Sequence, residues 1–338
     1  MTLKIGINGF GRIGRNIVRA FIENVNKDIQ IVAINDLAPI DISAHLLEYD
    51  SVHGPLRKKI DFFENKLVFG KEIINYSSYS NPMEINWGKL GVELVLECTG
   101  VFSDSEKAKL HISGGAKKVI VSAPCNNADK TIVYGVNHKK ILKSDKIVSA
   151  ASCTTNCLAP MVSVLDNQCG IDQGFMTTIH AYTQDQRVLD SFHKDKYRAR
   201  SAAQNIIPTS TGAAKAVGLV LPSMEGKLDG VAVRVPTPNV SAVDFVFMPK
   251  NLITAEKLNQ GIILASKTSE LKGILDYTDK ALVSSDLTHN PASSIFHLDQ
   301  TKILDTGMVR VFSWYDNEWG FSNRMLDISN YIFKEKLI

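Results

Sequence analysis

The stretch that most constrains the fold lies at residues 4–22, where a short apolar run leads through closely spaced glycines into a segment with helical apolar spacing. Gly9, Gly11 and Gly14 form the pattern G-x-G-x-x-G between this predicted strand and this predicted helix. The first glycine permits a tight turn, the second lets the backbone approach a pyrophosphate, and the third lets the helix pack closely on the strand. Free N–H groups at the helix start would bind the pyrophosphate. The stretch therefore predicts a dinucleotide-binding unit.

A second predicted strand, residues 29–35, ends at Asp36, which lies 22 residues after Gly14. An acidic residue at about this distance accepts hydrogen bonds from the adenosine ribose. Its charge would repel a 2′-phosphate, so the sequence favours NAD over NADP. The alternative interpretation is that Asp36 only caps the turn that follows.

Three more apolar runs, residues 92–98, 118–122 and 146–149, read as strands with helix-like or turn-like segments between them. This alternation predicts a doubly wound parallel sheet of the Rossmann type. Thr99 with Gly100, and Ser122, fall just after strand ends, where ligands of such sheets bind. Ordinary turn chemistry explains these positions almost as well. The alternating residues 60–74 predict a hairpin with a structural role only.

Cys153 stands where an apolar strand-like run gives way to a helix-like run. A helix start carries free N–H groups and partial positive charge, which favour the thiolate that attacks carbonyl groups. Cys157 lies one helical turn further on, but two cysteines on one continuous helix are poorly placed for a disulfide, and no other zinc ligands are nearby. We expect no metal site. The alternative is that Cys153 is a small buried residue.

Partners for this thiol are predicted in the second half of the chain. Residues 174–183 read as a strand that ends at His180, which could move protons to and from a cysteine or could be a structural residue. The polar residues 184–205 form a functional or interface loop. Residues 208–215 offer hydroxyls and a glycine at a helix start, which suits an anion. Arg234 interrupts an alternating strand, as a phosphate clamp or as an outward surface residue.

The 338 residues, 44% of them hydrophobic, are enough for two domains, the second with a largely antiparallel sheet covered by helices. A formal net charge of +3 gives no reason to expect nucleic acid or a membrane as the main partner. No apolar stretch is long enough to span a bilayer, and the start reads as a strand rather than a signal peptide. Five scattered cysteines suggest reduced thiols and a cytoplasmic location.

Six motifs together resemble phosphorylating glyceraldehyde-3-phosphate dehydrogenase, in order from residue 3 to about residue 332. They lie at residues 6–15, 152–157, 180–183, 210–216, 234–241 and 314–320. The resemblance implies a Rossmann-type NAD-binding domain over residues 1–152, completed by a C-terminal helix at about 318–338. It also implies an α+β catalytic domain over residues 153–317.

The resemblance further implies the activity. Enzymes of this family oxidise D-glyceraldehyde 3-phosphate with NAD and inorganic phosphate to 1,3-bisphosphoglycerate, a reaction of glycolysis and gluconeogenesis. Cys153 would form a hemithioacetal and then a thioester, and His180 would move the protons. The implied contacts to NAD are Gly9, Gly11, Arg12, Ile13, Gly14, Asp36, Ser122 and Asn317. Thr183 and Arg234 resemble the site for the substrate phosphate, and the attacking phosphate would meet Ser152, Thr154, Arg200, Thr211 and Gly212.

The family also implies a homotetramer in which residues 184–205 reach the cofactor of a neighbouring subunit. Ala150 and Ser80 depart from the residues usual in the family, an asparagine and an arginine, and they bear on the strength of NAD binding. The nearest rival function is that of erythrose-4-phosphate dehydrogenase. Asp36 argues against an NADP-dependent semialdehyde dehydrogenase, and the near-neutral charge argues against a non-catalytic RNA-binding protein.

Overall fold

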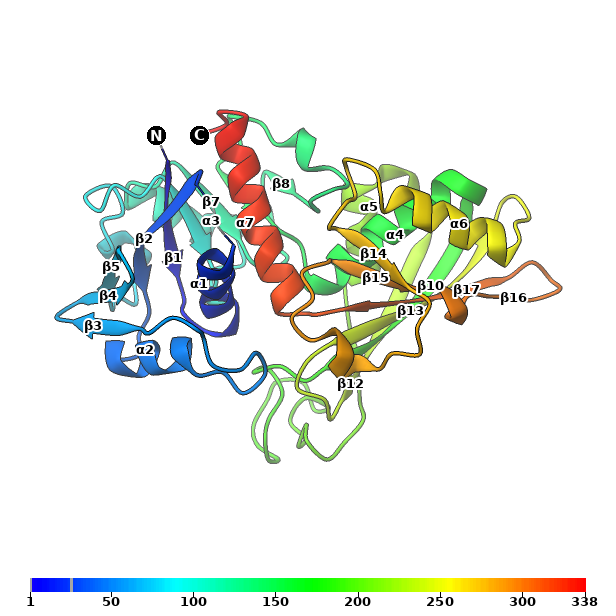
Figure 1. The fold of residues 1–338 in the computed structure, drawn as a ribbon, viewed down its shortest axis with the longest axis horizontal. Coiled ribbons are helices and arrows are strands. Elements are labelled where there is room, and N and C mark those ends of the chain that lie inside the picture. The colour runs from blue at the N-terminus through cyan, green and yellow to red at the C-terminus, as the bar shows by residue number, and fades with distance from the viewer. Residues whose placement is uncertain (1, 25–26) are drawn as a thin grey trace. The chain divides into compact units, whose positions relative to one another are not determined.

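The computed structural model describes residues 2–24 and 27–338. It divides the chain into two compact units, which are treated separately below (Figure 1). The first unit comprises Met1–Ile132, His138–Ser152 and Ser322–Ile338, and the second comprises Val133–Asn137 and Cys153–Phe321. The chain passes from the first unit to the second between Ser152 and Cys153.

The first unit contains a nine-stranded sheet in the order β3-β4-β5-β2-β1-β6-β7-β9-β8. Its strands are β1 Leu3–Asn8, β2 Ile29–Asn35, β3 Asp61–Phe63, β4 Lys66–Phe69, β5 Glu72–Ser77, β6 Leu94–Glu97, β7 Lys118–Val121, β8 Lys130–Thr131 and β9 Ile147–Ser149. All neighbouring pairs are parallel except β3 with β4 and β4 with β5. From β1 the strand order runs one way through β2 to β5 and the other way through β6 to β7. This reversal between β1 and β6 is where doubly wound sheets bind ligands.

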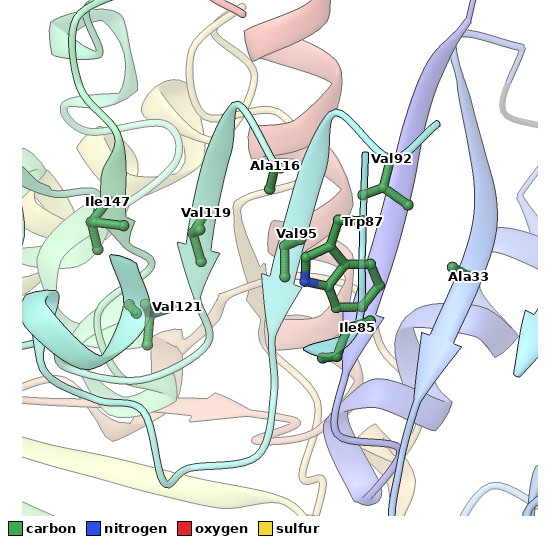
Figure 2. Packing of buried hydrophobic residues seen from close by; sticks show 10 residues of the cluster. Ala33, Ile85, Trp87, Val92, Val95, Ala116, Val119, Val121 and Ile147 are labelled. Carbon is green, nitrogen blue, oxygen red and sulfur yellow. The ribbon is translucent and has the colours of Figure 1, made fainter. Parts of the chain in front are cut away.

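The helices of the first unit are α1 Arg12–Glu23, α2 Ile40–Glu48 and α3 Ser105–Ser113, with most of α7 Trp319–Lys334. Short 3-10 helices lie at Pro82–Glu84 and His138–Lys140. Apolar side chains of β2, β6, β7 and β9 form a buried cluster with Ile85 and Trp87 (Figure 2). Trp87 is fully buried and packs so closely on β1 that a methyl group at Gly6 would lie 2.6 Å from its ring.

The second unit contains an eight-stranded sheet in the order β11-β12-β10-β13-β17-β15-β14, with β16 paired to β17. Its strands are β10 Ile171–Ala181, β11 Ile207–Ser210, β12 Leu228–Val235, β13 Ser241–Pro249, β14 Leu275–Thr278, β15 Ser294–His297, β16 Lys302–Ile303 and β17 Val309–Tyr315. Only β10 with β12 and β14 with β15 are parallel pairs. The sheet is therefore largely antiparallel.

Helices α4 Cys153–Cys169, α5 Ala213–Val220 and α6 Ala255–Ala265 pack together and on one face of this sheet. Three short 3-10 helices lie at Pro222–Met224, Ser284–Leu287 and Leu298–Gln300. On β10 the side chains alternate, so that Met176, Thr178 and His180 are buried while Phe175 and Ile179 are exposed. The two faces of the sheet are therefore different, one packed against helices and one with apolar side chains open to solvent.

The predicted fold class is confirmed: a parallel doubly wound sheet and a largely antiparallel sheet occur in one chain. The predicted strand at residues 29–35 coincides with β2, and helix α4 begins at Cys153 as expected. The predicted hairpin is the pair β3 and β4, which continues into β5. Residues 207–210, read as part of a helix start, form an edge strand before α5. Among the described residues no helix is long and apolar enough to cross a bilayer.

Candidate active site

The glycine turn of the first unit has the geometry that dinucleotide binding requires. Gly9 has a φ of +92°, a left-handed conformation that favours glycine. A methyl group at Gly14 would overlap the carbonyl oxygen of Gly9, so only glycine lets α1 pack this closely on the turn. Helix α1 begins after Gly11 with no side-chain cap and no acidic residue in its first turn. Its N-terminal N–H groups and partial positive charge are therefore suited to the pyrophosphate of a dinucleotide.

Side chains around this turn are fixed by ion pairs and hydrogen bonds. The Arg12 guanidinium binds both carboxylate oxygens of Asp50, at 2.5 Å and 3.2 Å. Burial alone would raise the pKa of Asp50, but the Arg12 hydrogen bond and the N–H groups of Val52 and His53 hold it at about 2. Ile13 follows in the first turn of α1 and is half-buried. Because its side chain is engaged by Asp50, Arg12 offers a ligand chiefly its backbone.

Asp36 follows β2 directly and accepts hydrogen bonds from the backbone N–H groups of Phe10 (2.5 Å) and Ala38 (2.8 Å). The carboxylate thus caps its own turn, and it also ties that turn to the glycine turn. A cavity of about 580 Å³ opens beside it, lined by Leu37, Ala38, Pro39, Ile40, Asn65, Tyr76, Ser77, Ser78 and Tyr79. Ser122 follows the last residue of β7 and donates its N–H to the carbonyl of Glu97.

In the second unit, the helix start and a strand end bring a thiol and an imidazole together. The Sγ of Cys153, the first residue of α4, lies 3.6 Å from the Nε2 of His180 on β10. The Nδ1 of His180 donates to the carbonyl of Ala181 (2.6 Å), and the Nη1 of Arg234 donates to the same carbonyl (2.9 Å). Arg234 is the partner of His180 on the parallel strand β12, which explains why the three side chains meet.

Arg234 is not an outward surface residue. Its Nη1 lies 2.6 Å from the Nδ1 of His180. Its Nε is buried and has no hydrogen-bond partner within residues 2–24 and 27–338. A half-buried guanidinium whose buried Nε has an unused donor is suited to an anion such as a phosphate group.

Burial is the main cause of the pKa shifts of Cys153 and His180. Burial lowers the pKa of His180, and the charge of Arg234 lowers it further, to about 3. Burial also raises the pKa of the Cys153 thiol, while Arg234 and hydrogen bonds from Thr154 act in the opposite direction. The net result differs from the thiolate expected from the helix start alone, because desolvation outweighs the partial charge of the helix. A neutral imidazole therefore faces a thiol.

Tyr315, at the end of β17, is a residue of the site that the sequence did not single out. Its hydroxyl is hydrogen bonded to Thr154 (2.8 Å) and Thr178 (2.9 Å), and its ring meets the His180 ring edge-on at 5.9 Å. Burial raises the pKa of Tyr315 well above 10. Tyr315 lies within the motif at residues 314–320, but sequence spacing alone could not show that its hydroxyl contacts Thr154 in the first turn of α4.

Asn317 is buried and lies two residues beyond Tyr315, just after the end of β17. Its Oδ1 accepts from the Oγ of Ser241 (2.8 Å), which itself accepts from the N–H of Ala181 (3.0 Å). Ser241 therefore orients the Asn317 amide, with the oxygen toward Ser241 and the NH₂ group directed away from it. The following turn is fixed by Asp316, which accepts from the N–H groups of Glu318 and Trp319.

The loop at residues 184–205 has neither helix nor strand, as expected. At its start, the N–H and hydroxyl of Thr183 donate to Gln186. Arg200 binds Asp190 and is largely exposed. Arg198 instead donates from Nε to the hydroxyl of Thr209 (3.0 Å) and also pairs with Asp185.

Arg198 also contributes to lowering the pKa of Arg234, after the larger effect of burial, so its charge acts on the site. The hydroxyl of Thr209 ties Arg198 to β11, the strand that pairs with the Arg234 strand β12. Arg198 and Arg200 are separated by a single residue, so sequence spacing could not show which of them contributes to the anion site.

The remaining predicted anion contacts lie at helix starts. Gly212 precedes α5, and no side chain caps that helix. The hydroxyl of Thr211 accepts from the N–H of Ala213 (3.2 Å). Thr155 donates to the carbonyl of Ala213 (3.3 Å), which joins the first turns of α4 and α5. Ser152 ends the His138–Ser152 segment of the first unit and precedes α4 directly. In the described part of the chain no cluster of His, Cys, Asp or Glu could hold a metal ion.

A doubly wound sheet with a glycine turn, and a cysteine with a histidine and a half-buried arginine, define an NAD-dependent dehydrogenase that uses a cysteine. Comparison with known families agrees. The model of the glyceraldehyde 3-phosphate dehydrogenase NAD binding domain matches residues 3–105, and that of the C-terminal domain matches residues 152–317. The chain belongs to the glyceraldehyde-3-phosphate dehydrogenase family, which confirms the resemblance found in the sequence.

Similar proteins match along nearly the whole chain. A glyceraldehyde-3-phosphate dehydrogenase of Xanthobacter flavus is 56% identical over 97% of both chains, and one of Cereibacter sphaeroides is 55% identical over the same share. Glyceraldehyde-3-phosphate dehydrogenase 1 of Bacillus subtilis is 51% identical over the full length of both chains.

Proposed function

We propose that this protein oxidises D-glyceraldehyde 3-phosphate with NAD and inorganic phosphate, giving 1,3-bisphosphoglycerate and NADH. The observation that carries the proposal is the approach of His180 Nε2 to Cys153 Sγ, 3.6 Å, beside the half-buried Arg234. Membership of the family supports the substrate and the cofactor.

Cys153 adds through its sulfur to the aldehyde carbon of the substrate. With its Nδ1 hydrogen given to the Ala181 carbonyl, His180 presents the lone pair of Nε2 to the thiol and accepts its proton. The proton then passes to the former aldehyde oxygen, which gives a hemithioacetal. Because the pKa of His180 is low, the imidazole is neutral at physiological pH and its Nε2 lone pair faces the thiol.

The hemithioacetal is oxidised next. His180 removes the hydroxyl proton as the carbonyl group reforms, and NAD, when bound, supplies the acceptor for the hydride that leaves the same carbon. The product on Cys153 is a thioester. Inorganic phosphate attacks the thioester carbon, the carbon–sulfur bond breaks, and the sulfur recovers a proton from His180. The N–H groups at the start of α4 can stabilise the negative oxygen formed in each addition.

We assign the substrate phosphate to Arg234 and Thr183, because the Nε of the half-buried guanidinium has a donor to offer. The attacking phosphate is assigned to the starts of α4 and α5, with Ser152, Thr154, Thr211 and Gly212. We assign the arginine of this second anion site to Arg198 in place of Arg200, because the Arg198 side chain is 23% exposed and donates to Thr209, whereas that of Arg200 is 63% exposed and pairs with Asp190 at the surface.

NAD would be held by the glycine turn and the start of α1, with Asp36 on the adenosine ribose and the adjoining cavity for the adenosine. Asn317, oriented by Ser241, would offer its NH₂ group to the nicotinamide carboxamide. The same assignment includes the backbone of Arg12 and Ile13, and Ser122.

We also propose a cytoplasmic homotetramer. The exposed apolar face of the second sheet supports self-association, since Phe175 and Val231 are 50% and 41% exposed and lie on neighbouring strands. A cavity of about 820 Å³ also lies beside Phe175, lined by residues of α5, β10, β12 and β13. A second copy of the chain would cover this face, and the loop at residues 184–205 would reach the neighbouring subunit. Five free thiols fit a reducing compartment.

The test is NADH formation, followed by absorbance, from D-glyceraldehyde 3-phosphate and NAD with and without inorganic phosphate. Parallel assays use erythrose 4-phosphate as substrate and NADP as cofactor. We expect fast turnover only with the three-carbon aldehyde, NAD and phosphate together. Preference for the four-carbon sugar with little need for phosphate would instead assign the rival activity, and no turnover on either would contradict both.

A further inference from the structure

Four neighbouring parallel strands of the first unit each end in a polar residue, and the four side chains form one hydrogen-bonded row. The residues are Glu97 of β6, Asn8 of β1, Asn35 of β2 and Ser77 of β5, and each lies opposite the next in the sheet. Asn8 donates to Glu97 (2.7 Å), Asn35 donates to Asn8 (2.9 Å), and Ser77 donates to Asn35 (2.9 Å). The row crosses the carboxyl edge of the sheet, where the turns of the dinucleotide site begin.

Glu97 carries the charge of this row. Its side chain is 1% exposed, and its carboxylate accepts from four donors. Oε2 accepts from Asn8 and from the Nε2 of His111 (2.9 Å), and Oε1 accepts from the N–H (2.7 Å) and the hydroxyl of Thr99. A carboxyl group surrounded only by donors is satisfied as the ionised form, which has no hydrogen of its own. Glu97 is therefore a buried anion whose hydrogen bonds are strong.

The partners of His111 fix its state as well. The indole Nε1 of Trp87 donates to His111 Nδ1 at 3.0 Å, and an indole nitrogen is never an acceptor. His111 Nδ1 is therefore the acceptor, so the ring hydrogen is on Nε2 and is donated to Glu97. The fully buried imidazole acts as a neutral donor that holds the carboxylate in place.

The Glu97 link spans the point at which the strand order reverses. Asn8 precedes the glycine turn after β1, and Thr99 lies in the turn after β6. These two turns touch, because a methyl group at Gly9 would lie 2.6 Å from the N of Thr99. The hydroxyl of Thr99 also accepts from the N–H of Val101 (3.0 Å), so the second turn is held in shape by the same set of bonds. One carboxylate thus ties together both turns that flank the ligand crevice of the sheet.

We propose that Glu97 is a positioning residue for NAD: from below the site it fixes the spacing of the turns after β1 and β6, with His111 as its orienting partner. The proposal rests on the NAD-dependent function proposed above. Glu97 makes no contact with reacting atoms, and its effect comes from holding backbone N–H groups ready for the dinucleotide, which reduces the ordering needed on binding.

The test compares Glu97→Gln with wild type and with Glu93→Gln as a matched control. Glu93 lies just before the same strand and pairs with Lys117 at the surface, so the control removes one carboxylate away from the turns. In Glu97→Gln the amide keeps the shape, but its NH₂ group must face either Thr99 or the Asn8 and His111 donors. NAD affinity is measured by titration calorimetry on the cofactor-free enzyme, together with kcat and both KM values and with thermal unfolding.

We expect Glu97→Gln to weaken NAD binding about tenfold or more, since half of a charge-assisted cluster is lost. The KM for NAD rises equally, while kcat at saturating NAD and the KM for the aldehyde stay within about twofold of wild type. Glu93→Gln binds NAD as wild type does. A Glu97→Gln protein that unfolds at a lower temperature but binds NAD with unchanged affinity would overturn the proposal and leave Glu97 a purely structural residue.

A pair of substitutions at His111 tests the proposal independently if Glu97→Gln does not fold. The amide of His111→Gln can donate to Glu97 and accept from Trp87, whereas His111→Leu can do neither. We expect the glutamine variant to bind NAD within about threefold of wild type and the leucine variant about tenfold more weakly. Equal affinities in the two variants would contradict the orienting role. Failure of wild-type protein to bind NAD would instead contradict the proposed function.

Discussion

The Nη1 of Arg234 lies 2.6 Å from the Nδ1 of His180, and both groups donate to the carbonyl of Ala181. A permanent cation therefore stands beside the imidazole that faces the Cys153 thiol. Burial and this charge together keep the imidazole neutral. The same charge acts on the thiol in the direction of ionisation. One arginine thus favours loss of the proton from Cys153 and opposes retention of a proton on His180.

The low pKa of His180 predicts a pH dependence of stability. In the unfolded chain this histidine binds a proton below about pH 6.5, while in the folded protein it does so only near pH 3. The unfolded state therefore binds more protons in this window, so His180 makes the folded protein less stable as the pH falls from about 6.5 towards 3, with no effect above. Wild type should lose up to about 1.4 kcal/mol per pH unit more than His180→Gln. Denaturant unfolding of both proteins between about pH 5 and pH 7 measures this slope, and equal slopes would contradict it.

Replacement of Arg234 should make the thiol less reactive. In Arg234→Gln the cation that opposes the effect of burial is lost, so the pKa of Cys153 rises further. We expect alkylation by iodoacetamide at neutral pH, in the absence of ligands, to slow about three- to tenfold. Arg57→Gln, which removes a charge from an exposed position of the first unit, is the control and should alkylate at the wild-type rate. An unchanged rate in Arg234→Gln would show that the charge does not act on the sulfur.

The two arginines of the loop at residues 184–205 give a direct test of the second anion site. Arg198→Gln should raise the KM for inorganic phosphate about tenfold or more, because it removes the half-buried cation that we assign to this site. Arg200→Gln removes only an exposed pair with Asp190 and should change this KM by less than about twofold. Initial rates at varied phosphate and saturating aldehyde decide between them. A larger rise in the KM for phosphate in Arg200→Gln than in Arg198→Gln would assign Arg200 to the site instead.

Gly14 should tolerate no side chain. In Gly14→Ala the new methyl group would overlap the Gly9 carbonyl, so either the turn or helix α1 must move. We expect NAD binding to fall below detection and the protein to lose about 1–3 kcal/mol of stability, the range for an overpacked site. Gly88→Ala is the matched control in the same unit, since its methyl group would meet its nearest neighbour at 3.5 Å. Calorimetric NAD titration and thermal unfolding of the two variants provide the comparison.

A charge on the exposed face of the second sheet should disrupt assembly. We expect Val231→Asp to form smaller species than wild type in light scattering coupled to size exclusion, because the carboxylate would be buried against a second copy. Leu264→Asp, on an exposed position of helix α6, should keep the wild-type mass. If Val231→Asp assembles as wild type does, this face is not the interface.

Much of the fold could be predicted because its signals are local. The glycines before α1, the apolar run of β2 and the hydroxyl-rich start of α4 each identify an element from adjacent residues. The chemistry of Cys153 was less accessible. Its helix start favours the thiolate, but the opposing effect of burial depends on what covers the sulfur, and no local pattern reports that.

Contacts between distant strands also lay beyond the sequence pattern. The position of Arg234 in its alternating strand fits either a phosphate clamp or a surface residue. Only the pairing of Arg234 with His180 on the neighbouring strand distinguishes the two interpretations. The hydroxyl of Tyr315 reaches Thr154 across 161 residues of chain. Arg198 and Arg200 differ only in which way the loop turns their side chains. Such contacts depend on tertiary packing, which spacing along the chain does not record.

The row formed by Glu97, Asn8, Asn35 and Ser77 has a consequence for folding as well as for binding. Side chains alternate between the two faces of a strand, so a slip of one residue in any of these strands would remove its polar group from the row. The buried Glu97 carboxylate would then lose donors and incur the full cost of desolvation. Short parallel strands made of similar apolar residues offer few other means of telling one alignment from the next. The row therefore specifies the register of β6, β1, β2 and β5. Only the native alignment of these strands gives the Glu97 carboxylate all of its hydrogen-bond donors.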